Sequence, residues 1–144
     1  MQYTIRQANV KSTLTAADGS CRVWSEVEAV SVNKFLPESS VHRPQTQAQL
    51  LYDPQGLHGR FQVEDRFVRC VRTEYGSEVW KDSCVEFFVE PKPGRGYFNF
   101  EFNSGGAFLV NHIVDPRRTA DGFKEFVRIP KSVAGAVRVE ASLP

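Results

Sequence analysis

Three short polar side chains stand at alternate positions in the segment from Tyr97 to Asn103, namely Asn99, Glu101 and Asn103. The positions between them are all phenylalanine, and this strict alternation over the segment is typical of a β-strand with two unlike faces. We expect the phenylalanine face to be buried and the amide and carboxyl face to meet solvent. Amides and carboxylates exchange hydrogen bonds with hydroxyl groups, so the polar face is suited to a polyhydroxylated ligand.

A further carboxylate joins this face if the preceding segment forms a hairpin with the strand. The stretch 91–96 is rich in turn residues and separates the strand from a second alternating segment around Glu86. In such a hairpin Val85 and Phe87 lie with the phenylalanines, and Glu86 lies with the amides. The polar face then carries a row of acids and amides drawn from two neighbouring strands.

The register of this hairpin decides which side chain faces Glu86, and the sequence leaves two registers open. In one, Glu86 lies directly across from Glu101, with Cβ atoms roughly 5 Å apart, and two like charges need a cation or a shared proton. In the other, Glu86 faces Asn99, which gives a neutral donor and acceptor pair.

The elements that must position these residues are short β segments separated by turn residues, a pattern typical of an all-β fold. We expect one domain spanning 1–144, built as an antiparallel β-sandwich of jelly-roll or immunoglobulin-like architecture. Turns are expected at Asp18-Gly19 and elsewhere, and long loops at Phe35–Thr46 and Asp115–Glu125. The expected strands are approximately Gln2–Gln7, Ala29–Asn33, Gln47–Tyr52, Leu57–Val63, Phe67–Arg72, Ser83–Glu90, Tyr97–Asn103, Ala107–Ile113 and Ala136–Leu143.

Charge and hydropathy exclude several classes of partner. The 144 residues include 18 Lys plus Arg and 17 Asp plus Glu, so no strong overall field would attract nucleic acid or an anionic membrane. The sequence has no apolar run of membrane-spanning length, and its first residues lack the pattern of a signal peptide. We therefore expect a neutral or small partner and, by default, a cytoplasmic location.

Cysteines and histidines do not form a recognisable metal or haem motif. The three cysteines, Cys21, Cys70 and Cys84, cannot all pair and show no CxxC spacing, so we expect small buried side chains, with Cys84 on the face of Glu86. His42, His58 and His112 are scattered along the chain. No metal ligand, cofactor or catalytic residue is predicted from them.

The motifs together resemble carbohydrate-binding module family 9, and more closely the bacterial family-9-like proteins. The most specific element is Trp80–Phe88, which reads WKDSCVEFF, followed by the strand YFNFEFN at 97–103. Weaker support comes from Asp18-Gly19 shortly before Trp24–Glu26, and from the segments 48–53 and 57–65. The resemblance extends over nearly the whole chain.

This resemblance implies a β-sandwich that holds the end of a sugar in a cleft. Trp80 matches the aromatic residue that stacks on the pyranose ring, and Glu86, six residues later, matches the acid that binds hydroxyl groups. Asn99, Glu101 and Asn103 lie where the next strand would cross that site. The implied ligand-binding set is therefore these five residues, and the implied partner is a mono- or oligosaccharide.

Two further features follow from the resemblance. The pocket of the family is completed by a second stacking aromatic residue from a later strand, and this sequence ends at Pro144 before such a position. A complete chain would then bind weakly, whereas a fragment would carry the second wall in its missing part. The family can also bind structural calcium, for which Asp53, Asp65 and Asp82 are candidates, although no DxDxDG loop is present.

The sequence thus favours a non-catalytic carbohydrate-binding module. A glycoside hydrolase acting through Glu86 and Glu101 is the first alternative, disfavoured because an open sheet face would not separate their pKa values. A structural or interaction domain without a ligand is the second. We expect Trp24 to belong to the core, and Arg60, Arg69 and Arg72 to be surface charges, one of which could neutralise the acid pair.

Overall fold

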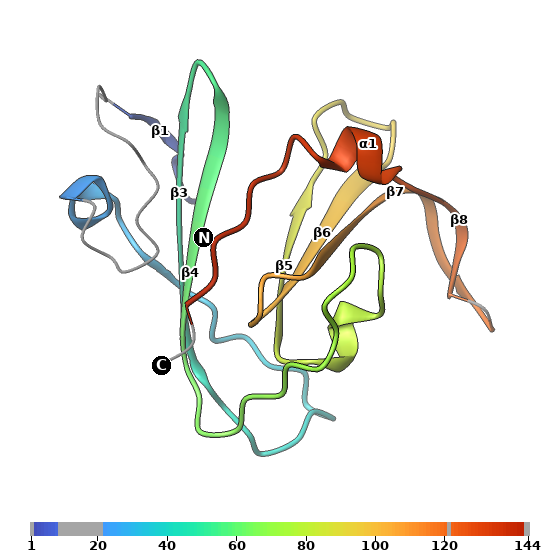
Figure 1. Cartoon of the computed structure of the whole chain (residues 1–144), viewed down its shortest axis with the longest axis horizontal. Helices are drawn as coiled ribbons and strands as arrows, with labels where there is room; N and C mark the ends of the chain where they lie inside the picture. Colours follow the sequence, from blue (N-terminus) through green and yellow to red (C-terminus); the bar gives the residue numbers. More distant parts are fainter. Residues whose placement is uncertain (1, 9–21, 121, 143–144) are drawn as a thin grey trace. The chain divides into compact units, whose positions relative to one another are not determined.

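The computed structural model describes residues 2–8, 22–120 and 122–142 (Figure 1). The chain divides into two compact units, Met1–Phe67 and Val68–Pro144, and each contains a four-stranded β-sheet. The prediction of an all-β fold with two sheets of mostly antiparallel strands is confirmed, while the assignment of 1–144 to one domain stays a prediction. The expected turn at Asp18-Gly19 and Cys21 lie outside the described residues. Among the residues described, no helix is long and apolar enough to cross a membrane.

The sheet of the first unit is dominated by one hairpin. Its long strands are β3 (Gln45–Asp53) and β4 (Gly56–Glu64), with the short β1 (Arg6–Gln7) and β2 (Val30–Ser31) on the free side of β3. The Asp53 carboxylate accepts hydrogen bonds from the backbone N–H groups of Gln55 and Gly56, which stabilises the tight turn. The strands predicted at 47–52 and 57–63 are therefore confirmed, whereas those at 2–7 and 29–33 are reduced to the two-residue strands β1 and β2.

A glutamine side chain fastens the 3-10 helix η1 (Arg22–Glu26) to this sheet. Gln49 Nε2 on β3 donates to the backbone oxygens of Trp24, at 2.8 Å, and Val27, at 2.7 Å. Trp24 is buried, as predicted for a core residue. The first unit thus encloses a small core beneath a helical turn held by hydrogen bonds from a strand side chain.

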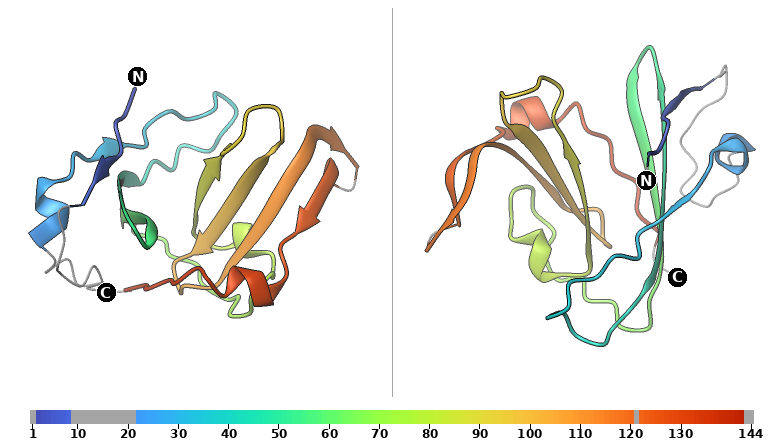
Figure 2. Two further views of the ribbon diagram at one scale, coloured as in Figure 1. Left: turned by 90° about the horizontal axis from the view of Figure 1, so that it is seen from above. Right: turned by 180° about the vertical axis from the view of Figure 1, so that it is seen from behind.

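The second unit contains the predicted polar strand. Its strands β5 (Cys84–Val89), β6 (Tyr97–Asn103), β7 (Phe108–Thr119) and β8 (Gly122–Arg128) are adjacent in chain order and all antiparallel (Figure 2). The 3-10 helix η2 (Val79–Lys81) precedes β5 and contacts both β5 and β6, and the single helical turn α1 (Lys131–Ala134) follows β8. The bounds of β6 match the prediction from alternation.

The strand predicted at Phe67–Arg72 is wrong, because side chains rather than a neighbouring strand satisfy the backbone there. The N–H of Arg69 donates to the Ser83 hydroxyl, and the N–H groups of Val71 and Arg72 donate to the Asp82 carboxylate. The segment is extended but forms no ladder. Side-chain acceptors thereby compete with sheet formation.

Two predictions after residue 113 are also wrong. The expected loop Asp115–Glu125 is instead the hairpin of β7 and β8, in which Pro116 falls at a register irregularity between Asp115 and Arg118, a place that tolerates proline. The strand expected at Ala136–Leu143 is not found over 136–142, and Leu143 lies outside the described residues. Its alternating side chains instead approach Gly106, where an added Cβ would lie 3.4 Å from Ala141 Cβ.

The polar face of β6 is buried, which contradicts the prediction that it meets solvent. Asn99 is 2%, Glu101 6% and Asn103 4% exposed, whereas the phenylalanines of the other face are only half-buried. Beside Glu101, Leu109 packs with Val79 of η2, Ala107 and Cys84 to form a core cluster within this unit. The row of amides and acids is therefore enclosed by protein, and each polar atom needs a partner there.

Gly96, at the end of the β5–β6 turn, provides a first test of the fold. Its φ is 79°, and an added Cβ would lie 2.2 Å from the backbone oxygen of Ile113. We expect Gly96→Ala to lower the free energy of unfolding by about 2 kcal/mol, through backbone strain and this overlap. Gly94→Ala is the matched control, because Gly94 has φ 72° but no atom within 4 Å of the added Cβ. Urea unfolding should show the smaller loss, about 1 kcal/mol, for the control, and equal losses would contradict the steric argument.

Candidate functional site

The hairpin register places the two predicted acids opposite each other. Glu86 on β5 pairs with Glu101 on β6, so the first of the two registers left open by the sequence is the one adopted. Glu101 in turn lies opposite Leu109 of β7, which is fully buried. One carboxylate of the pair is thus shielded by an apolar neighbour while the other is exposed.

This arrangement separates the acidities of the two carboxyl groups. Burial, and then the charge of Glu86, raise the pKa of Glu101 to about 7. Partial desolvation also raises the pKa of Glu86, against the opposing influence of Asn99 and Arg118. Burial and the two nearby carboxylates raise the pKa of the Cys84 thiol to about 12. At neutral pH the Glu101 carboxyl is therefore protonated in part of the molecules, and Cys84 is a thiol.

An amide side chain connects to this pair but leaves acceptors unused. Asn99 Nδ2 donates to Glu101 Oε1 at 2.7 Å. The other oxygen of that carboxylate, Glu101 Oε2, and the amide oxygen Asn99 Oδ1 are both buried and have no hydrogen-bond partner. Two unsatisfied buried acceptors side by side are unusual and point to a missing donor or cation.

Two arginines near the acids were missed by the sequence analysis. Arg118 and Arg128 both lower the pKa of Glu101 through their positive charges. Arg128 Nε donates to Asn111 Oδ1 at 2.7 Å, and its Nη1 donates to the backbone oxygen of Gly76, which fixes the guanidinium over the sheet. Arg118 was expected to be an ordinary surface residue of the loop Asp115–Glu125, and no sequence signal marked Arg128, which lies beyond that loop at the end of β8. Of the arginines that were considered, Arg72 is bound to Asp82 instead.

Asn103, the third predicted polar residue of β6, has no hydrogen-bonding group left for a ligand. Its Nδ2 donates to the Arg72 backbone oxygen and to the Asp82 carboxylate, at 2.8 and 3.0 Å. Its Oδ1 accepts the N–H groups of Gly105 and Ala107. The side chain therefore holds the turn after β6 to the segment before η2.

Exposed aromatic side chains precede and follow Glu86 in the sequence. Trp80 in η2 is 45% exposed, although its neighbour Val79 is fully buried. Phe88, two residues after Glu86 on β5, is 53% exposed, and its ring centroid lies 5.8 Å from that of Tyr97. Exposed rings beside polar groups are the usual components of a sugar-binding surface.

The candidate calcium ligands are hydrogen-bonded to protein groups, and the two described cysteines differ in exposure. The carboxylates of Asp53, Asp65 and Asp82 all accept hydrogen bonds from backbone N–H groups, and each also contacts a histidine or arginine. Cys70 is exposed, which corrects its prediction as a buried side chain, and Cys84 is half-buried.

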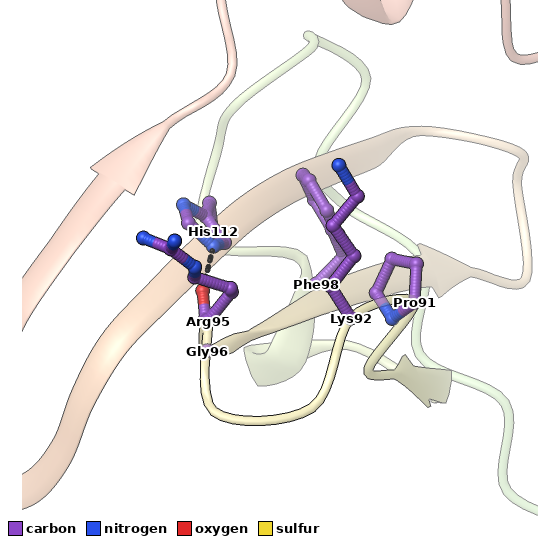
Figure 3. A pocket seen from close by; sticks show the side chains of 6 residues that line it. All are labelled: Pro91, Lys92, Arg95, Gly96, Phe98 and His112. Atoms are coloured by element: carbon purple, nitrogen blue, oxygen red, sulfur yellow. Dashed lines mark hydrogen bonds between the residues drawn. The ribbon is translucent and has the colours of Figure 1, made fainter.

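A hollow lies on the opposite face of the second sheet, and Lys92, Arg95 and His112 are among the residues that line it. It has a volume of about 220 Å³ and lies beside the β5–β6 turn (Figure 3). His112 stacks on Phe98 there, with ring centroids 4.8 Å apart, and His112 Nε2 donates to the backbone oxygen of Arg95. Its lining is completed by Pro91, Lys92 and Gly96.

Comparison with known proteins agrees with this architecture. A protein from Bacteroides uniformis ATCC 8492, named as a candidate carbohydrate-binding protein, has a crystal structure similar to this chain, with a TM-score of 0.64 and 23% sequence identity. The alignment covers 78% of this chain and 48% of that one, so this chain spans about half the length of the similar protein. This likeness concerns the fold alone. A search of the curated proteins found none that matches.

The family model named carbohydrate-binding family 9 matches residues 16–127, which is most of the chain. The matched range includes both Trp80 and the β5–β6 hairpin with its opposed acids. The resemblance noted from the motif WKDSCVEFF and the following polar strand is thereby confirmed. The chain belongs to carbohydrate-binding family 9.

Proposed function

We propose that this chain is a non-catalytic carbohydrate-binding module that recognises a mono- or oligosaccharide on the polar face of its second sheet. The observation that carries the proposal is the exposed carboxylate of Glu86 next to the exposed ring of Phe88 on the same face of β5. A carboxylate accepts hydrogen bonds from sugar hydroxyl groups, and an exposed ring offers an apolar surface to the sugar. Membership of a carbohydrate-binding family supports the same conclusion.

In this proposal the aromatic side chains supply the apolar contact with the sugar. Trp80 serves as the stacking platform, and Glu86 accepts hydrogen bonds from hydroxyl groups. Phe88 and Tyr97 form a further aromatic surface on the other side of Glu86 along the chain. Asn99 and Glu101 form the floor of the site, while Asn103 supports it from beneath through its bonds to Arg72 and Asp82.

Isothermal titration calorimetry with a panel of mono- and oligosaccharides tests this function. We expect one class of sugar to bind, and Trp80→Ala and Glu86→Ala each to weaken that binding roughly tenfold or more, because an aromatic or charge-assisted contact is lost. Phe67→Ala is the matched control, since Phe67 is an exposed aromatic residue of the other unit. Failure of every sugar to bind the intact chain would favour the alternative of a structural domain without a ligand.

A glycoside hydrolase is the second candidate, and one observation favours it more than the sequence did. Glu86 and Glu101 carry oxygens within 4.8 Å of each other, and the pKa of Glu101 is raised to about 7, as a general acid requires. Against it, Glu101 is only 6% exposed. Turnover of aryl glycosides that is abolished by Glu101→Gln would establish this activity in place of simple binding.

A further inference from the structure

Three metal-ligand side chains converge on the polar face of the second sheet. Cys84 Sγ, one carboxylate oxygen of Glu86 and one of Glu101 all lie within 4.8 Å of one another. Cys84 and Glu86 project from β5, and Glu101 projects from the paired position of β6, so the ladder holds the three in register. We propose that Cys84, Glu86 and Glu101 form a binding site for a divalent cation of the zinc type.

A second observation points independently to a ligand at this place. Asn99 is 2% exposed, and its amide is directed at the cluster, since Nδ2 lies 2.7 Å from Glu101 Oε1. Its oxygen Oδ1 has no partner, and neither has Glu101 Oε2. Rotation of the Asn99 amide by half a turn exchanges nitrogen and oxygen at the same volume, which would offer the cation a fourth ligand.

The charge of the site also calls for a cation. The two carboxylates face each other across adjacent strands, and such like-charged pairs are destabilising unless a proton or a cation lies between them. The guanidinium groups of Arg118 and Arg128 act on Glu101 through their charge, but no hydrogen bond from either to a carboxylate of the pair is found within the described residues. A coordinated ion would supply the missing direct contact.

The chemistry of the ligands selects the kind of ion. Ca²⁺ and Mg²⁺ bind oxygen ligands only, so the thiol of Cys84 would contribute nothing to them. Zn²⁺ and Co²⁺ accept thiolate and carboxylate together, in tetrahedral sites that often keep one position for water. Binding displaces two kinds of proton to solvent, the Cys84 S–H proton and the proton held on the Glu101 carboxyl, which leaves a thiolate and two carboxylates around two positive charges, and the arginines compensate the remainder.

The proposal goes beyond sugar binding and can be tested without a sugar. The intact chain is freed of metal with a chelator, transferred to chelator-free buffer and titrated with Co²⁺, while the thiolate-to-cobalt charge-transfer band is recorded. We expect the band to saturate at one equivalent and to disappear when Zn²⁺ is added. Cys84→Ser should abolish the band, and Glu86→Gln should weaken Co²⁺ binding by at least about tenfold.

Cys70→Ser is the matched control, because Cys70 is an exposed cysteine outside the cluster and its replacement should leave the band unchanged. Glu86 is exposed, so Glu86→Gln remains informative if Cys84→Ser does not fold. The proposal is overturned if no band saturates at one equivalent, if Cys84→Ser folds and retains the band, or if Glu86→Gln binds Co²⁺ as tightly as the unaltered chain. In that case a proton on one of the two carboxyl groups is enough to reduce the repulsion between Glu86 and Glu101.

Discussion

Replacement of Asp82 by alanine is expected to destabilise the second unit by about 3–5 kcal/mol, the range found when one partner of a buried ion pair is removed. The Asp82 side chain is completely buried. Its Oδ2 accepts the N–H groups of Val71 and Arg72 and the Nδ2 of Asn103, at 3.0, 2.8 and 3.0 Å. Its Oδ1 accepts from Arg72 Nη1 at 3.1 Å.

The size of this effect follows from what remains after the carboxylate is removed. Four donors lose an acceptor whose side chain is completely buried, and one of these donors is a guanidinium that is 22% exposed. Burial disfavours the charge of Asp82, yet these donors outweigh it and hold the pKa of the carboxyl well below its ordinary value. Asp82→Asn is therefore expected to be nearly as damaging, because its amide presents N–H groups to other donors.

Urea unfolding followed by circular dichroism measures the loss, and Asp115→Asn is the matched control. Asp115 also has a strongly lowered pKa, caused by Arg117, but it lies on the β7–β8 hairpin, where the Arg117 side chain is 71% exposed. A pair of this kind contributes less than about 1 kcal/mol. If both variants lost the same stability, the central role assigned to the buried network would be wrong.

The Asp82 network also explains why part of the fold escaped the sequence analysis. Alternation predicted β6 to its terminal residues, because every second side chain there meets a different environment. The segment 68–83 has no such periodicity, and the side chains of Asp82 and Ser83 accept the backbone N–H groups of Arg69, Val71 and Arg72 within it. Contacts between a side chain and a distant backbone leave no repeat in the sequence, so the covering of the polar face could not be foreseen.

The candidate site was predictable only where it depends on the alternating hairpin. The hairpin placed Glu86 beside the β6 residues, and only the register was undecided. Glu101 lies opposite the fully buried Leu109 of β7, and Leu109 packs with Val79 of η2, so the surroundings of Glu101 come from other elements. Arg128 reaches the acids through a hairpin whose β7 strand contains a proline and register irregularities, features that usually indicate a loop. Residue types therefore indicated the class of ligand. The raised pKa of Glu101 and the nearby arginine charges could be recognised only in the three-dimensional structure.

The buried carboxyl of Glu101 gives the second large expected effect, a gain of stability at alkaline pH in Glu101→Gln. The folded state raises the pKa of this group from an ordinary value of 4.5 to about 7. The folded chain consequently holds the proton more tightly than the unfolded chain. The stability associated with the protonated carboxyl is fully present below pH 4.5 and is lost as pH rises to about 7.

Glutamine keeps the shape of the neutral acid and cannot ionise. We therefore expect Glu101→Gln to match the unaltered chain in free energy of unfolding at pH 5, within about 1 kcal/mol, and to exceed it by about 3 kcal/mol at pH 8. The glutamine Oε1 can still accept from Asn99 Nδ2, and its Nε2 can donate to Glu86 in place of the shared proton. A chelator in all buffers removes any contribution from a bound cation.

Urea titrations at several pH values between 5 and 8 provide the measurement, with Glu140→Gln as a control that removes one exposed carboxylate from the same unit. The control should retain the decline of stability with rising pH, and Glu101→Gln should remove most of it. If the free energy of unfolding fell equally steeply with pH in both variants, ionisation of Glu101 would cost little folding stability. Glu86 and Glu101 would then not share a proton. A decline that disappears in Glu101→Gln would instead identify the opposed acids as the main source of pH sensitivity in this fold, because no other change was made to the buried row.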